Sequence, residues 1–454
     1  MNRLRRRLMA VSVAFLTGCT PAPQSAPPAR ALGMADTLPP MRTFAARRFP
    51  RPTRPNAEIA QDFLDLSFRM ESGRPIARMT RFEGPISVRV TGAVPPSLMP
   101  DLRSLLGRFR AEAGIDIFMT GAPTASITIE AVPRAELQRA VPRAACFVVP
   151  RISSWDEFKR VRRTPQVDWT TLQRRDRAVV FVPADVAPQE IRDCLHEEIA
   201  QALGPLNDLY RLPDSVFNDD NIHAVLTGFD MLILRAYYSD DLRNGMSRGE
   251  VAARLPGVLA RLNPGGQTGP AAPRNDTTRN WIEAMETAMS SGATPNRRRE
   301  AAREAITLAQ NFRWDGTRSG FAHYAYGRLQ VGYNPDLALA SFQAAQNAYG
   351  QSPLTQIHAA HVAVQIAAFA LAAGDADSVL NIVDRAIPVA GAHQNAALLA
   401  TLMMFRAEAL EMTGRYSEAD AVRLDSLAWA RYGFGSERNI RARQREIAGL
   451  NPAK

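Results

Sequence analysis

Residues 188–208 hold the side chains whose types and spacing could do chemistry. On a helical wheel, the apolar positions form one stripe: Ile191, Leu195, Ile199 and Ala202. Glu198 falls inside this stripe. Glu197 and Gln201 lie side by side one turn apart, and His196 lies on another face. A carboxylate in a core-facing stripe is costly unless it is paired, protonated or bound to a metal. Glu198 is therefore the candidate catalytic residue. The alternative is an ordinary acid that caps a helix or forms an ion pair.

The spacing around this glutamate resembles a metal-hydrolase motif with substituted ligands. His196 cannot start the zinc motif HExxH, because its second ligand position is Ala200. One residue later, the chain fits the metzincin spacing H-E-x-x-H-x-x-G-x-x-H/D with Glu197-Glu198-x-x-Gln201-x-x-Gly204-x-x-Asn207. The catalytic glutamate and the turn glycine, Gly204, are kept, whereas Glu197, Gln201 and Asn207 stand at the three ligand positions.

These substitutions decide which ion the motif could hold. Zinc favours imidazole and thiolate ligands, accepts carboxylate, and binds amide oxygens poorly. Oxygen ligands suit a hard ion such as calcium. His223, in the acidic polar loop 218–223, is a further candidate ligand. A network without metal, in which the amides of Gln201 and Asn207 hold Glu198, fits equally well. The cofactor is thus left open between none, zinc and calcium.

The stretch HEEIAQALGPLNDLYRLPDSVFNDDNIH (residues 196–223) resembles the bacterial exported family called domain of unknown function 2927. The resemblance covers about residues 60–250. Members of the family share the signature EExxQxxGxxND, which ends here at Asp208, and have no established activity. The resemblance implies a zincin-like fold without zinc protease activity. It places Asp230 and Met246 at the supporting helix and the methionine turn of a metzincin.

Residues 57–256 are expected to form one α+β domain around this motif. Helices are predicted at 57–70, at 97–113, from Pro188 onward and near 221–240, and strands at 86–90, 125–132, 145–149 and 178–182. This order of helix, strands and motif helix also resembles the zincin core.

Residues 280–454 show only helical periodicity and follow a linker at 257–279 that is rich in Pro, Gly and Asn. Turns around Gly332, Gly374 and Gly414 lie 42 and 40 residues apart, and each precedes an alanine-rich helix. The last unit, ALEMTGRYSEADAV, resembles a tetratricopeptide hairpin. A stack of helical hairpins that binds a protein partner is therefore expected.

The N-terminus is typical of an exported lipoprotein. Residues 1–18 combine four arginines with an apolar run at 8–16 that is too short to cross a membrane as a helix, which indicates a signal peptide. Leu16-Thr17-Gly18-Cys19 resembles the lipobox, which implies an acylated Cys19 as the new N-terminus. A Pro/Ala/Arg-rich tether at 19–56 would follow. These features predict a lipid-anchored envelope protein, on the periplasmic face of the outer membrane.

The distribution of charge argues against nucleic-acid binding. The formal net charge is +10, but residues 1–57 contain ten arginines and one acidic residue, so the rest of the chain is near neutral. The arginine-rich arm is better explained as a linker close to an anionic lipid surface.

Two cysteines remain besides Cys19, namely Cys146 and Cys194. An isolated pair in an oxidising compartment usually bonds, so a disulfide is expected.

Three functions fit these patterns. The first is a degenerate zincin-like binding or scaffold module whose helical array recruits a partner. The second is a metal-dependent hydrolase, acting on peptide or cell-wall material, with Glu198 as general base. The third is a structural envelope protein whose first domain presents the helical array.

Overall fold

The computed structural model describes residues 38–142, 144–271 and 275–452. The expected signal peptide, Cys19 and the first part of the tether lie outside the described residues. By its internal contacts the chain divides into Met1–Leu38 and a second compact unit, Pro39–Lys454. The fold of the second unit combines a small mixed sheet with many helices.

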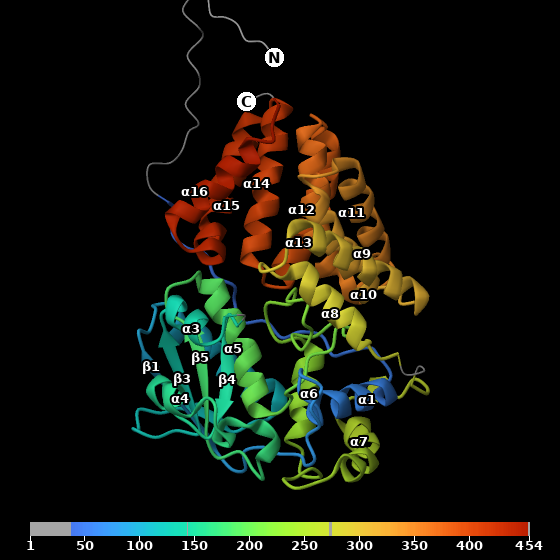
Figure 1. Ribbon diagram of the computed structural model, residues 1–454. Coiled ribbons are helices and arrows are strands. Elements are labelled where there is room, and N and C mark those ends of the chain that lie inside the picture. The colour runs from blue at the N-terminus through green and yellow to red at the C-terminus, as the bar shows by residue number, and fades with distance from the viewer. Residues whose placement is uncertain (1–37, 143, 272–274, 453–454) are drawn as a thin grey trace, which may run out of the picture. The chain divides into compact units, whose positions relative to one another are not determined.

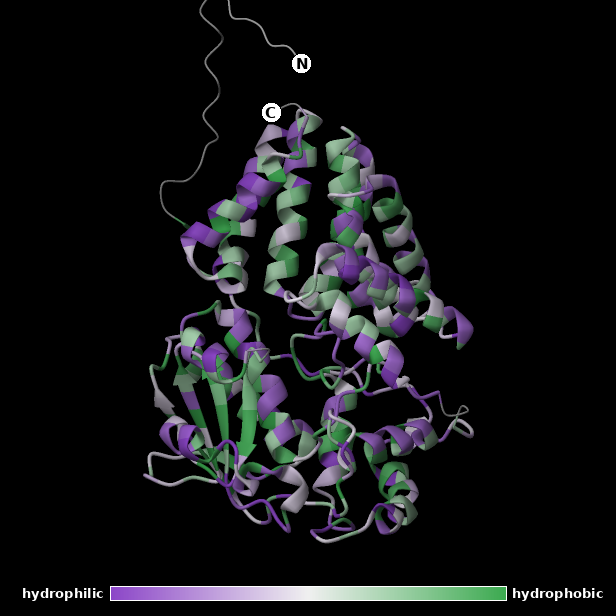
Figure 2. Cartoon of the chain, viewed as in Figure 1, coloured by the Kyte–Doolittle hydropathy of each residue, from purple (hydrophilic) through white to green (hydrophobic). Residues whose placement is uncertain are grey.

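Apolar runs in the first half of this unit form one five-stranded sheet (Figure 1). The strands are β1 Ile86–Gly92, β2 Ile117–Met119, β3 Ile127–Val132, β4 Phe147–Pro150 and β5 Ala178–Pro183. Their order across the sheet is β2-β1-β3-β5-β4, and only β4, at one edge, runs antiparallel to its neighbour. Every residue of β5 is buried, as is usual for a strand of a parallel sheet covered on both faces. The strands are largely apolar in Figure 2.

The same half of the unit also contains helices and short turns. They are α1 Asn56–Ser67, α2 Leu98–Arg108 with a π-helical turn at Phe109–Ala113, α3 Arg134–Ala140, α4 Trp155–Val161, 3-10 turns at Pro165–Val167 and Trp169–Thr171, α5 Pro188–Leu203, α6 Gly228–Tyr237, α7 Arg248–Leu262 and a 3-10 turn at Pro264–Gly266. The motif helix α5 packs against β5, β4 and α2. It therefore lies beside the antiparallel edge of the sheet.

Each strand and helix expected for this region is present, with two differences. The helix expected near 221–240 is only α6, because Thr227 caps its first turn and residues 204–227 form an irregular loop. Helix α7 continues to Leu262, inside the range expected to be a linker. The short strand β2 and the helices α3, α4 and α7 were not expected.

The C-terminal half is a helical array, as predicted. Its helices are α8 Arg279–Met289, α9 Pro295–Asn311, α10 Thr317–Gln330, α11 Pro335–Tyr349, α12 Gln356–Ala372 after a 3-10 turn at Pro353–Thr355, α13 Ala376–Ala392, α14 Ala396–Met412, α15 Tyr416–Phe434 and α16 Glu437–Ala448. The three turn glycines are exposed. Gly374 and Gly414 have φ angles of 78° and 75°, in the left-handed region that glycine adopts without strain.

One segment of the array is also apolar enough to resemble a membrane span. Pro353–Ala372 is 20 residues long, and its mean hydropathy reaches 1.4. Here it packs among neighbouring helices, and His358 within it is fully buried. Length and composition alone therefore cannot distinguish this core helix from a membrane span.

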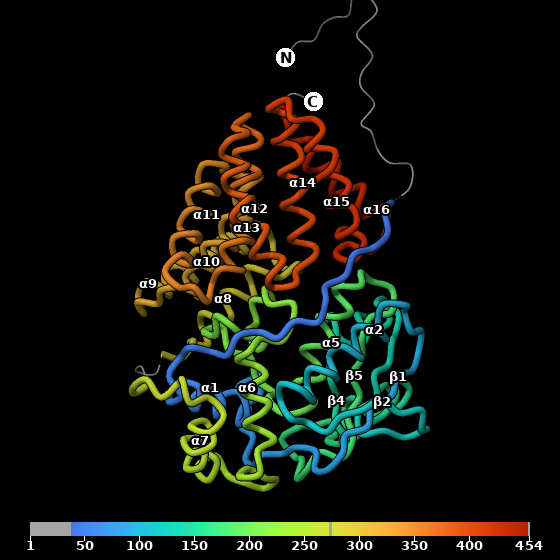
Figure 3. The backbone as a smooth tube through the Cα atoms, turned by 180° about the vertical axis from the view of Figure 1, so that it is seen from behind, coloured from blue at the N-terminus to red at the C-terminus, as the bar shows by residue number. Residues whose placement is uncertain are grey.

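The described part of the expected tether, residues 39–55, lies in extended form along the folded unit (Figure 3). The backbone N–H of Arg42 donates to the Ala428 carbonyl at 3.0 Å, and the ring of Phe44 stacks on Trp429. At the other end of this stretch, Arg54 forms ion pairs with Asp62 and Asp214. The sequence predicted a tether whose arginines lie close to an anionic lipid surface. The contacts correct this expectation for residues 39–55, because at least part of their arginine charge is matched by acids of the same chain.

Candidate functional site

Helix α5 carries the motif, and its C-terminal end is held by an arginine from another segment. Pro188 occupies the first turn, where its missing N–H costs nothing. At the other end, the guanidinium of Arg175 donates to the carbonyls of Gln201 and Ala202, at 2.6 and 2.7 Å, and to that of Gly204. A Cβ at Gly204 would lie 3.0 Å from the ring of Tyr237. Close packing against this ring therefore favours glycine at this position.

Glu198 lies in the buried stripe that the wheel predicts. Its side chain is 5% exposed, and its Oε2 has no hydrogen-bond partner among the described residues. Burial raises the pKa of Glu198 well above its usual range, and the neighbouring charges of Glu197 and Glu71 raise it further. Only the backbone N–H of Val148, on β4, opposes this shift. These surroundings therefore favour the neutral form of Glu198.

Other carboxyl groups gather around Glu198 from three segments. Glu197 is on α5, Glu71 follows α1, and Asp208 and Asp219 lie in the loop after α5. Burial and the other acids raise the pKa of Glu197 to about 8 and that of Asp219 to about 6, and they raise that of Asp208 well above its usual range. We call these residues the carboxyl cluster: Glu71, Glu197, Glu198, Asp208 and Asp219.

The amides at the other ligand positions do not hold Glu198. The Gln201 side-chain N–H donates to Asp208 at 3.5 Å, and that of Asn207 donates to the Asp65 carbonyl at 2.9 Å. The expected network of Gln201 and Asn207 around Glu198 is therefore replaced by bonds to other groups. In the described ranges no three His, Cys, Asp or Glu side chains form a group that could hold a metal ion.

His223 lies in a different cluster. Its Nε2 is 2.9 Å from the Pro213 carbonyl oxygen, and its ring centroid lies 5.5 Å from that of His358 and 5.6 Å from that of His393. His358 Nε2 is 3.0 Å from a carboxylate oxygen of Asp220. The polar and ring contacts found for His223 in the described chain do not include a motif residue, so its candidate role as a ligand has no support.

This histidine cluster gives a prediction for pH. Burial is the largest cause that lowers the pKa of His361 to about 4 and of His393 to about 3, and it also lowers that of His223. Arg328 and Arg47 add positive charge nearby, whereas Asp220 opposes the shifts of His223 and His361.

Because an unfolded histidine titrates near 6.5, the unfolded chain takes up protons first as pH falls from about 6.5 toward 4, and stability is lost over that window. These histidines therefore lower the melting temperature as pH falls from 7 to 5, whereas the acids with raised pKa act in the opposite direction over this window. The double variant His361→Asn/His393→Asn should therefore show a smaller fall, or a larger rise, in melting temperature than wild type between pH 7 and pH 5. Identical pH dependence of the two proteins, measured by circular dichroism, would refute this explanation.

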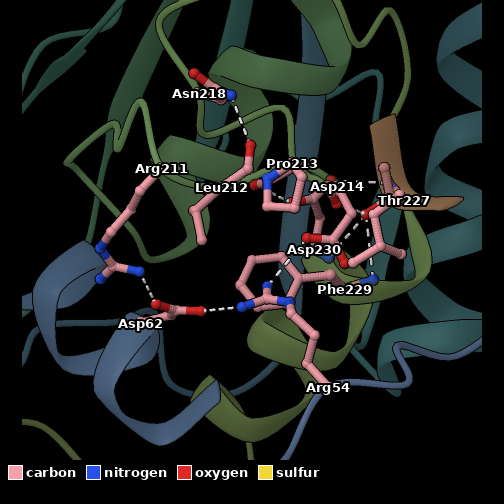
Figure 4. A network of polar contacts seen from close by, with 12 residues as sticks. Arg54, Asp62, Arg211, Leu212, Pro213, Asp214, Asn218, Thr227, Phe229 and Asp230 are labelled. Atoms are coloured by element: carbon pink, nitrogen blue, oxygen red, sulfur yellow. Dashed lines mark hydrogen bonds and ion pairs between the residues drawn. The ribbon is translucent and has the colours of Figure 1, made fainter. Parts of the chain in front are cut away.

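Asp230 and Met246, the residues placed in supporting roles, are structural here. Asp230 is fully buried, accepts from Ser215 Oγ at 2.5 Å and from the N–H groups of Val216 and Thr227, and completes a capping box at the start of α6 (Figure 4). Burial raises its pKa to about 6. Met246 is buried in the core, and its carbonyl accepts from the Met79 N–H at 2.8 Å.

The structure contains the expected disulfide. Cys146, directly before β4, is bonded to Cys194 on α5. The bond ties the edge strand to the motif helix, next to the Glu198–Val148 contact.

Sequence reasoning missed several residues that shape this site, namely Glu71, Arg175, Tyr210 and Asp219. Tyr210 donates to Asp219 and packs its ring against Trp281 of α8. They reach the site from segments distant in sequence or from a loop without periodicity. No sequence pattern around these four residues indicates that they lie at this site.

Comparison with known proteins agrees with the sequence resemblance. Residues 56–257 match the family described as "Protein of unknown function (DUF2927)". A search of curated proteins found no match.

Proposed function

We propose that this chain is a lipid-anchored envelope protein whose first domain is a degenerate zincin-like binding module and whose helical array recruits a protein partner. The order of helix, strands and motif helix supports the zincin-like assignment, because α2 and the strands precede α5 and its EExxQxxGxxND signature. The matched family covers this domain.

The state of Glu198 carries the proposal. A general base must be ionised before it can accept a proton. Here Glu198 is buried among acids that favour its neutral form. The amide of Asn207, at the third ligand position, is engaged by the Asp65 carbonyl. A buried carboxyl group whose neutral form is favoured is better suited to binding a ligand than to abstracting a proton.

The unpartnered Oε2 of Glu198 is the observation that favours a metal-dependent hydrolase instead. A divalent cation next to Glu197 would lower the pKa of both glutamates and restore an ionised base. Thermal melts with added zinc or calcium separate the two functions. We expect neither ion to raise the melting temperature, and a rise of several degrees in wild type but not in Glu198→Gln would favour the hydrolase.

The array offers a groove for a partner. It has a volume of about 380 Å³ and is lined by small alanines of α12 and by Arg385 of α13. Capture of partners from envelope extracts tests this part of the proposal. Arg385→Glu should reduce capture, whereas Arg438→Glu, exposed on α16, should not. Equal capture by both variants would mean that the partner does not use this groove, and no capture by wild type would argue for a purely structural role.

Anchoring through Cys19 gives a further prediction. Cys19→Ser should release the protein from membranes without unfolding it, because only the arginine-rich arm would remain to bind lipid. Fractionation and circular dichroism check the two parts of this statement. A variant that stays in the membrane pellet would contradict it.

A further inference from the structure

Helix α12 is apolar on all sides, but the rest of the chain covers it only in part. It packs against α11, α13 and α14. Only 44% of its most apolar 18-residue window is buried, although the mean hydropathy of that window reaches 1.4. A helix that is apolar all round normally lies inside a protein core or a membrane. Part of the apolar surface of α12 is therefore open to another molecule.

This open surface forms one wall of the groove of about 380 Å³ in the array. Two helices supply most of its lining, namely Ala359, Ala363 and Ile366 on α12 and Ile382, Ala386 and Val389 on α13. Positions i, i+4 and i+7 lie on one face of a helix, so each of the two helices turns an apolar face to the groove. The small alanines leave room that larger side chains would fill. The volume lies within the range of ligand sites, about 300–1,000 Å³.

Two polar groups of the groove lack partners in the described chain. Arg385, exposed on α13, is the one charged residue among the described residues that line the groove. No acid pairs with Arg385 in the described contacts, and the neighbouring Asp384 is paired with Arg406 at 2.8 Å. Gln346 of α11 has a buried side-chain oxygen, Oε1, that accepts no hydrogen bond. The groove therefore combines apolar walls with an unmatched guanidinium and a free acceptor.

These features select the chemistry of the occupant. Apolar walls fit apolar side chains, the guanidinium of Arg385 fits a carboxylate, and Oε1 of Gln346 requires a donor. An alkyl carboxylate has no N–H donor, whereas an extended peptide has free backbone N–H groups.

The walls also indicate which carboxylate fits. They are the sides of helices, whose backbone N–H groups are used within the helices, so they form no nest of N–H groups for a terminal carboxylate. An acidic side chain within the peptide is therefore the better partner for Arg385.

We infer that this groove binds an extended, apolar segment of a partner protein that carries an acidic side chain, and that this side chain pairs with Arg385. Successive side chains of an extended chain point to opposite sides, so apolar residues enter the groove while a neighbouring residue reaches the rim. The inference rests on the proposed role of the array in partner binding and specifies the chemistry of the partner.

Selection from a library of random heptapeptides displayed on phage tests the inference. The bait is the mature chain carrying Cys19→Ser, at neutral pH, and the bound peptides are sequenced after one round. We expect apolar peptides in which Asp and Glu are enriched about twofold to fivefold over the library, as a partly exposed ion pair allows. Arg385→Glu should lose this preference and favour Lys and Arg instead. Arg438→Glu, exposed on α16, is the control and should keep the preference for acids.

Calorimetric titration of the most enriched peptide then measures the ion pair itself. Replacing the acidic residue of the peptide by its amide should weaken binding to wild type by about twofold to fivefold. The same replacement should not weaken binding to Arg385→Glu. An excess of decanoate, which has a carboxylate and an alkyl chain but no N–H donor, should not displace the peptide.

Four results would overturn the inference. No peptide is enriched over the bare support, the enriched peptides show no preference for acids, Arg385→Glu, shown to be folded by circular dichroism, selects the same peptides as wild type, or decanoate displaces the peptide. The last result would assign the groove to an alkyl anion. In each case, capture of an envelope protein by wild type would leave the proposed function standing. If wild type captures no protein, the proposed function fails, and the peptide selection still decides what the groove binds.

Discussion

Glu198→Gln should stabilise the protein at pH 8–9 and change its stability little near pH 5. Burial and the charges of Glu197 and Glu71 raise the pKa of Glu198, so the folded protein holds a proton that the unfolded chain has lost. The sign follows from linkage: stability falls as pH rises from the unfolded value near 4.3 up to the folded pKa, by about 1.4 kcal/mol per pH unit for one proton. Glutamine has the same shape and no charge, so it removes this loss.

Thermal melts of both proteins between pH 5 and pH 9 check the expectation. Glu190→Gln is the matched control, because Glu190 lies on the same helix and pairs with Arg134 outside the cluster. It should not reproduce the gain. A destabilised Glu198→Gln at pH 8–9 would show that the ionised carboxylate has a partner that stabilises it.

Arg175→Met should cost about 1–3 kcal/mol of stability, the range expected when buried polar groups lose their hydrogen-bond partner. Arg175 is 4% exposed, donates to three carbonyls at the end of α5, and places its guanidinium 4.9 Å from the Trp169 ring centroid. No carboxylate pairs with it in the described contacts, so the helix end itself receives the positive charge. Methionine keeps an unbranched apolar stem and leaves the carbonyls without a donor.

Chemical denaturation of the variant measures this cost. The neighbouring Arg174→Met is the control, because Arg174 is exposed and forms a surface ion pair with Asp176, so its change should stay within about 0.5 kcal/mol. Equal effects for the two variants would mean that the end of α5 is stable without Arg175.

Most helices and strands, and the face of α5 on which Glu198 lies, could be predicted because they depend on the local periodicity of apolar residues. Apolar residues at helical spacing placed Glu198 in the buried stripe, and continuous apolar runs located β3 and β5. The disulfide followed from counting cysteines and from the inferred compartment.

Long-range groupings could not be predicted in the same way. Glu71 lies more than a hundred residues from Glu197 in sequence, and nothing in its surroundings indicates an acidic partner. The same holds for His223, His358 and His393, which come together from a loop, from helix α12 and from the turn after α13. The irregular loop after α5 depends on buried polar bonds such as those of Asp230, and periodicity does not report them.

Metal content tests the central claim most directly. The mature chain, purified without chelators from cells that export it, should contain well under one zinc or calcium ion per chain, and Glu198→Gln should contain the same amount. The reason is that Glu197, Gln201 and Asn207 stand at the ligand positions of the motif that the chain resembles, and that burial among acids favours the neutral form of Glu198. One tightly bound ion per wild-type chain, lost in Glu197→Gln, would contradict a binding module and make this domain a metal-dependent enzyme.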